Sequence, residues 1–191
     1  MKPTQKTKLI LKSAWLLFLV PIGIQAQSQC EIFKSEISNV ETHMNQVTQI
    51  VDSLRTKAET AAFGAQLKIV RSNAKRIEIL IGKALSSADE AVTRVGDSQY
   101  YSESCALDDV ISYTIDAESN TIDARDFLDE AYNNAKKANT ARTLGDIQYY
   151  MRKYQTASKM AKNSAEDAAY AAAIAHASCT HTDDLAIHGE R

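Results

Sequence analysis

The sequence predicts an all-α protein, an elongated antiparallel up-down four-helix bundle with coiled-coil-like heptad packing. Both prolines, Pro3 and Pro21, lie in the first 26 residues, so the rest of the chain lacks the residue that most disrupts a helix. Small apolar residues recur at alternating steps of three and four along nearly all of this remainder. Such a spacing keeps one face of each helix against its neighbours. Bundles host many functions, so the fold alone assigns none.

The first 26 residues are typical of an export signal. A basic start is followed by an apolar run over 14–24 and by a small residue, Ala26. The basic residues of this start are Lys2, Lys6, Lys8 and Lys12. The run has about half of the ~20 residues that a membrane-spanning helix needs, which favours a cleaved signal peptide at 1–26 over a retained anchor. Lipidation at Cys30 is disfavoured because the residues before it lack the small side chains of a lipidation signal.

Cleavage would leave a secreted or periplasmic protein of 165 residues. That length suits one helical domain, which we place at 27–180, with a flexible C-terminal tail at 181–191. Loss of four lysines changes the formal net charge from −2 to −6, and an acidic chain is a poor candidate for nucleic-acid binding. No second long apolar stretch occurs, so no membrane span is expected after cleavage.

The first helix of the bundle is expected to begin at Ser28, because Ser28 and Glu31 have the spacing of a capping box. It is expected to end before Gly64, which fits a position just past a helix end. Its apolar seam consists of Phe33, Ile37, Val40, Met44, Val47, Val51, Leu54, Ala58 and Ala61.

A second seam, out of step with the first, predicts a second helix that ends at Gly96. This seam consists of Val70, Ala74, Ile77, Ile81, Ala84, Ala88, Ala91 and Val95. Asp97 can then cap a third helix, which Ser119-Asn120-Thr121 could kink or divide. The third seam consists of Leu107, Val110, Thr114, Ala117, Thr121, Ala124, Leu128, Ala131, Ala135 and Ala138.

Gly145-Asp146 repeats the pattern of Gly96-Asp97, in which a glycine ends one helix and an aspartate caps the next, and so predicts the start of the fourth helix. Its seam consists of Ile147, Tyr150, Tyr154, Ala157, Ala161, Ser164, Ala168, Ala171 and Ala175. The contact residues therefore change from large side chains in the first helix to alanine in the last, which lets helix axes approach the low end of the usual ~8–10 Å. Short connections make neighbouring helices antiparallel.

Two hexapeptides, 96–101 and 145–150, match at five of six positions, and each ends in a tyrosine pair. They fit duplicated helical hairpins, two turns of similar geometry, or aromatic platforms that stack on a flat ligand such as a sugar. In an up-down bundle the two pairs would lie at opposite ends. We therefore expect that they do not form a single site.

Acidic residues repeat every seven positions along the third helix, at Asp109, Asp116, Asp123 and Glu130. The second helix carries a basic set, Lys68, Arg71, Lys75, Arg76 and Lys83. Complementary flanking charges that set the orientation of the helices would explain both sets, at about 0.2–1 kcal/mol for each exposed pair.

Three cysteines, Cys30, Cys105 and Cys179, permit one internal disulfide and a third cysteine outside it. An oxidising compartment would let such a bridge persist. In an up-down bundle the starts of the first and third helices and the end of the fourth lie together, so all three cysteines should gather there. We expect a Cys105–Cys179 bridge, with Cys30–Cys179 as the alternative. The third cysteine and the alanine-rich seams are also compatible with a homodimer.

His176, Cys179 and His181 are candidate ligands for zinc or copper, in a C-terminal segment that holds three of the four histidines. The competing interpretation, which we favour, is a solvated helix end whose cysteine is in a disulfide. Neither C-x-x-C nor H-E-x-x-H occurs, and no Glu-x-x-His pair indicates a di-iron centre. The sequence therefore predicts no cofactor.

No catalytic residue can be assigned, because neither a Gly-x-Ser-x-Gly motif nor a glycine-rich phosphate loop occurs. We expect a non-enzymatic protein that acts through its surface, as a structural or protein-interaction module with an unknown protein or envelope partner. The alternative is a metal- or small-ligand-binding protein that uses the His/Cys-rich C-terminal end.

Overall fold

The computed structural model describes residues 16–105 and 108–188, without the side chains of residues 16–28, 104 and 180–188. Within these ranges the elements follow in a simple order. They are α2 (Leu16–Phe63), α3 (Leu67–Ser102), the short 3-10 helix η2 (Glu103–Cys105), α4 (Asp108–Thr140) and α5 (Leu144–His188). The described part of the chain contains no strand, so the predicted all-α class is confirmed.

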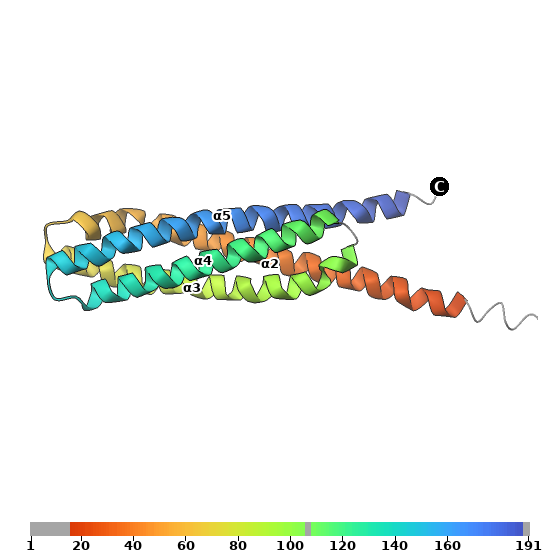
Figure 1. The fold of residues 1–191 in the computed structure, drawn as a ribbon, viewed down its shortest axis with the longest axis horizontal. Coiled ribbons are helices and arrows are strands. Elements are labelled where there is room, and N and C mark those ends of the chain that lie inside the picture. Colours follow the sequence, from red (N-terminus) through yellow and green to blue (C-terminus); the bar gives the residue numbers. More distant parts are fainter. Residues whose placement is uncertain (1–15, 106–107, 189–191) are drawn as a thin grey trace, which may run out of the picture.

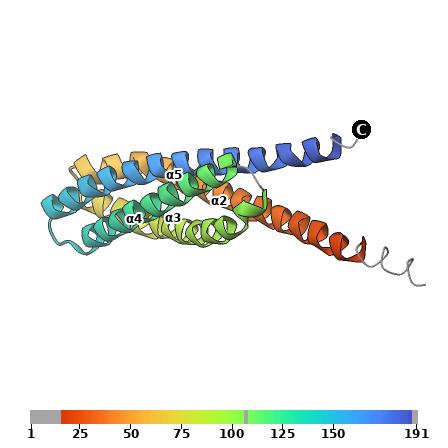
Figure 2. The ribbon, with the colours of Figure 1, turned by 45° about the vertical axis from the view of Figure 1, so that its right-hand side comes forward.

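The helices form an elongated four-helix bundle, as the heptads predict. Each helix packs on the next in sequence and α2 packs on α5, which closes the ring. The α2–α3 and α4–α5 turns lie at one end and the α3–α4 connection at the other, so neighbours are antiparallel (Figure 1). The beginning of α2 and the end of α5 extend beyond the α3–α4 connection and diverge from each other (Figure 2).

The core is built mainly from the predicted seams. Every seam residue of the first three helices for which the structure describes a side chain is buried; Leu107 lies outside the described residues. Large side chains such as Phe33 and Ile37 fill the interior from α2, whereas α5 contributes mainly alanine. Because a stripe of apolar groups on each helix must be removed from water, this pattern alone largely determines which faces meet.

The register of α5 differs from the prediction at two positions. Met151 and Ala165 are fully buried, whereas Tyr150 and Ser164 are partly exposed. The predicted seam included Tyr150 and Ser164 because the three-four spacing allowed either choice. Their hydroxyl groups explain the outcome, since a polar group at the rim of the core keeps access to water.

Two predicted helix boundaries are wrong. The helix that was expected to stop at Gly96 continues to Ser102, and the next helix begins at Asp108 rather than at Asp97. A single glycine inside a helix costs about 1 kcal/mol relative to alanine, which tertiary packing readily overcomes. α3 is followed instead by η2, Glu103–Cys105, and the antiparallel α4 begins at Asp108. α4 runs without interruption through Asn120, so the suggested division does not occur.

The capping box at Ser28 does not begin a helix in this chain, because α2 is already helical from Leu16. The amides near Ser28 therefore lie inside a helix, where a cap is not needed.

The remaining turns are close to their predicted places. α2 ends at Phe63, just before Gly64, as expected. α5 begins at Leu144, so Gly145 and Asp146 lie in its first turn. The cap is made by Thr143, whose hydroxyl accepts a 3.1 Å hydrogen bond from the Asp146 amide and donates a 2.6 Å one to the Asp146 carboxylate.

At the other end of α5, helix continues to His188 and so includes most of the segment that was predicted to be a tail. Residues 1–15 lie outside the described part of the chain, so signal-peptide cleavage stays a prediction. In the ranges that are described, no helix has an apolar stretch long enough to cross a membrane.

Candidate functional site

The three cysteines meet at the end of the bundle where α3 connects to α4. Cys30 comes from α2, Cys105 from the end of η2 and Cys179 from α5, and all three are buried. The sulfur of Cys30 lies 2.7 Å from that of Cys179 and 2.9 Å from that of Cys105. The prediction that an up-down topology gathers all three cysteines is therefore confirmed.

Cys105 and Cys179 are placed as a disulfide pair. Their sulfurs are within bonding distance, and their Cα atoms are 5.7 Å apart, in the usual range for a bridge. Cys30 contacts both sulfurs of this pair, so the alternative pairing with Cys179 is also within reach. The ring of helices thus brings together three cysteines that are far apart in sequence.

The cysteine cluster, defined as Cys30, Cys105 and Cys179, is also a set of metal-ligand atoms that lie within 4.8 Å of one another. Among the described side chains, no histidine or carboxylate belongs to this set. His176 is partly buried one turn before Cys179, and the side chain of His181 is outside the description. The predicted ligand trio of His176, Cys179 and His181 is therefore not assembled by the described residues, whereas a different trio is.

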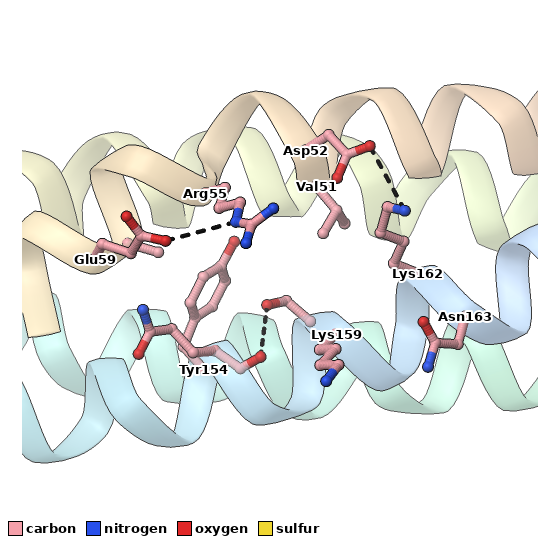
Figure 3. Close-up of a pocket in the computed structure, with 11 residues that line it drawn as sticks. Val51, Asp52, Arg55, Glu59, Tyr154, Lys159, Lys162 and Asn163 are labelled. Carbon is pink, nitrogen blue, oxygen red and sulfur yellow. Dashed lines mark hydrogen bonds and ion pairs between the residues drawn. The ribbon is translucent and has the colours of Figure 1, made fainter.

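A second feature, which no sequence motif predicts, is a groove between α2 and α5 (Figure 3). It has a volume of about 350 Å³. Its lining residues are Val51, Asp52, Arg55, Ala58, Glu59, Tyr154, Gln155, Ser158, Lys159, Lys162 and Asn163. A shallower hollow continues it toward the α2–α3 turn and adds Phe63, Arg152, Thr156 and Met160. We call this continuous surface the α2–α5 groove.

Tyr154 occupies the floor of the groove, and its ring projects from α5 toward α2 (Figure 3). The residue is only 1% exposed, and this burial raises the pKa of Tyr154 well above its usual range. The nearby Ser158 hydroxyl offsets that effect only in part. Ser158 donates its own hydrogen bond to the Gln155 carbonyl, at 3.2 Å, and the Tyr154 hydroxyl has no well-oriented partner among the described residues.

The rim of the groove carries more positive than negative charge. Arg55 pairs with Glu59 at 3.5 Å, and Lys162 lies 3.7 Å from Asp52. A hydrogen bond from Lys162 to Glu166, outside the groove, raises the pKa of this lysine.

Arg152 and Lys159 also line the groove, and neither has an ion-pair partner in the described part of the chain. The groove therefore carries two cationic side chains without an ion-pair partner among the described residues, although the formal net charge of the protein is negative.

Apolar side chains lie beside these charges. Phe63 is 68% exposed and Met160 is 43% exposed, and both line the outer part of the groove. The floor adds Val51 and Ala58. A groove with an apolar floor and a cationic rim can hold an elongated partner whose own surface is apolar on one side and acidic at its edges.

The two tyrosine pairs lie at opposite ends of the bundle, as predicted. Tyr100 and Tyr101 lie near the end of α3, whereas Tyr149 and Tyr150 lie in the first turns of α5. Within each pair the rings meet edge to face, at 5.0 and 5.3 Å between centroids. The matching hexapeptides therefore lie in different local settings, one before a helix end and one after a helix start. Of the three interpretations left open, that of two turns of similar geometry is wrong, because both hexapeptides are helical.

The predicted pairing of the acidic stripe on α4 with the basic set on α3 is also wrong. Among the described residues, no ion pair joins the two sets. Arg71 instead donates to the carbonyls of Ala141 and Arg142, at 3.3 and 3.2 Å. The α3–α4 ion pair that does form is Arg125–Asp89, at 3.1 Å.

Comparison with known protein families, with curated proteins and with solved structures finds no match to this chain.

Proposed function

We propose that this chain is exported and that it is a non-enzymatic structural or protein-interaction module, which binds an acidic segment of another protein in the α2–α5 groove. The observation that carries the proposal is the combination of exposed apolar and unpaired cationic side chains in one groove. Phe63 and Met160 offer apolar contact, and Arg152 and Lys159 offer charge. Exposed apolar patches rimmed by polar residues are typical of interaction sites.

The positive charge of the groove favours an acidic partner. The chain as a whole carries a formal charge of −2, and −6 after the predicted cleavage, so it repels acidic proteins in general. At the groove, the local excess of positive charge attracts acidic groups instead. An acidic amphipathic helix fits best, because its apolar stripe matches the floor and its carboxylates match the rim.

Site-specific photocrosslinking in cells that export the chain tests this proposal. A photoreactive amino acid at Met160 is expected to give one discrete protein adduct, and the adduct should be lost when Lys159→Glu is added. The matched control is the same amino acid at Ile79, an exposed position on α3, which does not line the groove. Equal adducts from both positions, no adduct from Met160, or an adduct that survives Lys159→Glu would contradict the proposal.

Export is tested separately by the N-terminus of the protein recovered outside the cytoplasm. The proposal expects a chain that starts at or near Gln27, because Ala26 supplies the small residue before the cleavage point. Recovery of residues 1–26 on the mature protein would contradict it.

A second candidate function is metal or small-ligand binding at the C-terminal end of the bundle. The observation in its favour is that Cys179, near the C-terminal end of the bundle, has its sulfur in contact with that of Cys30 and close to that of Cys105. It differs from the first candidate in location, because the cysteine cluster and the α2–α5 groove are formed by different parts of α2 and α5.

A further inference from the structure

The cysteine cluster contains every cysteine of the chain, and no two of its members are neighbours in sequence. Cys30 lies 75 residues from Cys105 and 149 from Cys179, yet its sulfur contacts both. A single structural disulfide needs two cysteines. The third, buried and in contact with both others, is not explained by the bridge alone.

We propose that in the reduced chain these three thiols form a three-coordinate site for a soft monovalent cation, Cu(I). This inference rests on the second candidate function and specifies its ligands. Thiolate sulfur is a soft ligand that favours Cu(I), zinc or iron–sulfur clusters over hard cations such as Mg²⁺. Structural zinc requires four ligands, and the described side chains supply three at this place.

The geometry requires only a modest change. With metal–sulfur distances of about 2.3 Å, three sulfurs in a trigonal arrangement lie about 4 Å apart. The present separations of 2.7 and 2.9 Å would open by about 1 Å each, which small side-chain rotations can supply. Cys105 is at the end of η2, beside the chain reversal, so its position is not fixed by a long helix on both sides.

Two polar side chains lie close in sequence to the cluster but are not part of it. Lys34, one turn after Cys30 on the same face of α2, is only 11% exposed and pairs with the Glu31 carboxylate at 3.1 Å. His176 lies three residues before Cys179 on α5, but its ring nitrogens are not among the ligand atoms that gather at the cluster.

Metal binding and the disulfide exclude each other. A Cys105–Cys179 bridge removes two of the three ligands, so the oxidised chain should not bind Cu(I). The reduced and oxidised forms of the same protein therefore provide a comparison that needs no mutation.

The experiment uses the protein purified from cells that export it. One sample is reduced with a phosphine and handled without oxygen, and the other is kept oxidised. Each is titrated with Cu(I) against a competing chelator, with detection of the sulfur-to-copper charge-transfer absorption. The proposal expects one Cu(I) per reduced chain and sulfur-only ligation by X-ray absorption. Oxidised protein that binds equally well, or reduced protein that does not bind, would overturn it.

Two variants separate this site from the His/Cys set that the sequence suggested. Cys30→Ser should weaken Cu(I) binding by more than about 100-fold, since loss of even an outer partner costs 10–100-fold. The control is His176→Ala with His181→Ala, which should bind within about 10-fold of the unmodified protein. Binding that survives Cys30→Ser, or that is lost in the histidine variant, would show that the three-thiol site is wrong. Neither outcome bears on the α2–α5 groove.

Discussion

The side-chain amide of Gln148 donates a 2.8 Å hydrogen bond to the backbone carbonyl of Gly64, which joins the first turns of α5 to the turn after α2. The Gly64 amide in turn donates to the Thr60 carbonyl, at 2.9 Å. Both backbone polar groups of Gly64 are therefore paired. This residue links the first and last helices of the bundle at the end opposite the cysteine cluster.

Gly64→Ala should destabilise the protein. A Cβ atom at this position would lie 2.5 Å from the Thr60 carbonyl oxygen and 3.0 Å from a methyl group of Val70, so the turn must shift. We expect a loss of about 1–3 kcal/mol in the free energy of unfolding, the range for overpacked sites. Urea denaturation followed by circular dichroism measures it. Unchanged or increased stability would show that the turn is not packed as described.

Gly96→Ala should have the opposite effect. A Cβ atom there meets nothing within 4 Å, and the residue lies inside α3. Replacing a glycine in the interior of a helix by alanine is expected to raise the free energy of unfolding by about 0.5–1 kcal/mol. The same denaturation experiment applies, with Gly64→Ala as the contrasting variant. A loss of stability would indicate that Gly96 ends the helix after all.

Tyr154→Phe should stabilise the protein and flatten its response to alkaline pH. The buried hydroxyl lacks a well-oriented partner, so its removal is expected to add about 1 kcal/mol at neutral pH. Burial raises the pKa of Tyr154 in the folded state, so above the unfolded pKa of about 10 the tyrosine ionises more readily in the unfolded chain, and the free energy of unfolding falls as pH rises. Tyr154→Phe lacks this loss.

The test compares urea midpoints of both proteins at about pH 7 and about pH 11, on either side of the ordinary tyrosine pKa. The other tyrosines and the lysines are shared, so they cancel in the comparison. An alkaline loss as large in Tyr154→Phe as in the unmodified protein would contradict the account.

Much of the fold follows from the sequence because the core residues repeat. Phe33 to Ala61 on α2 and Val70 to Val95 on α3 each form a single stripe, so both are buried when the two helices face each other along these stripes. The boundary at Gly96 could not be read in this way, because a glycine's local preference is weaker than the packing of Val95 and Ser98 on either side. The choice of Met151 over Tyr150 likewise depended on which side chain could leave a hydroxyl in water.

The two candidate sites also differ in how far the sequence predicts them. The cysteine cluster followed from topology, since an antiparallel bundle places Cys30, Cys105 and Cys179 at one end. The α2–α5 groove did not, because it depends on how closely two particular helices approach. One signal was present in the sequence: Tyr154 is a large polar aromatic residue in a seam that is otherwise mostly alanine.

The most direct test of the account is disulfide mapping of three single variants, Cys30→Ser, Cys105→Ser and Cys179→Ser. Each leaves two cysteines, and the three sulfurs lie within 4.8 Å of one another. The account predicts that every variant, oxidised as a monomer, forms its remaining bridge within one chain. A variant that keeps two thiols, or that bridges only between chains, would contradict the meeting of α2, η2 and α5 at one point.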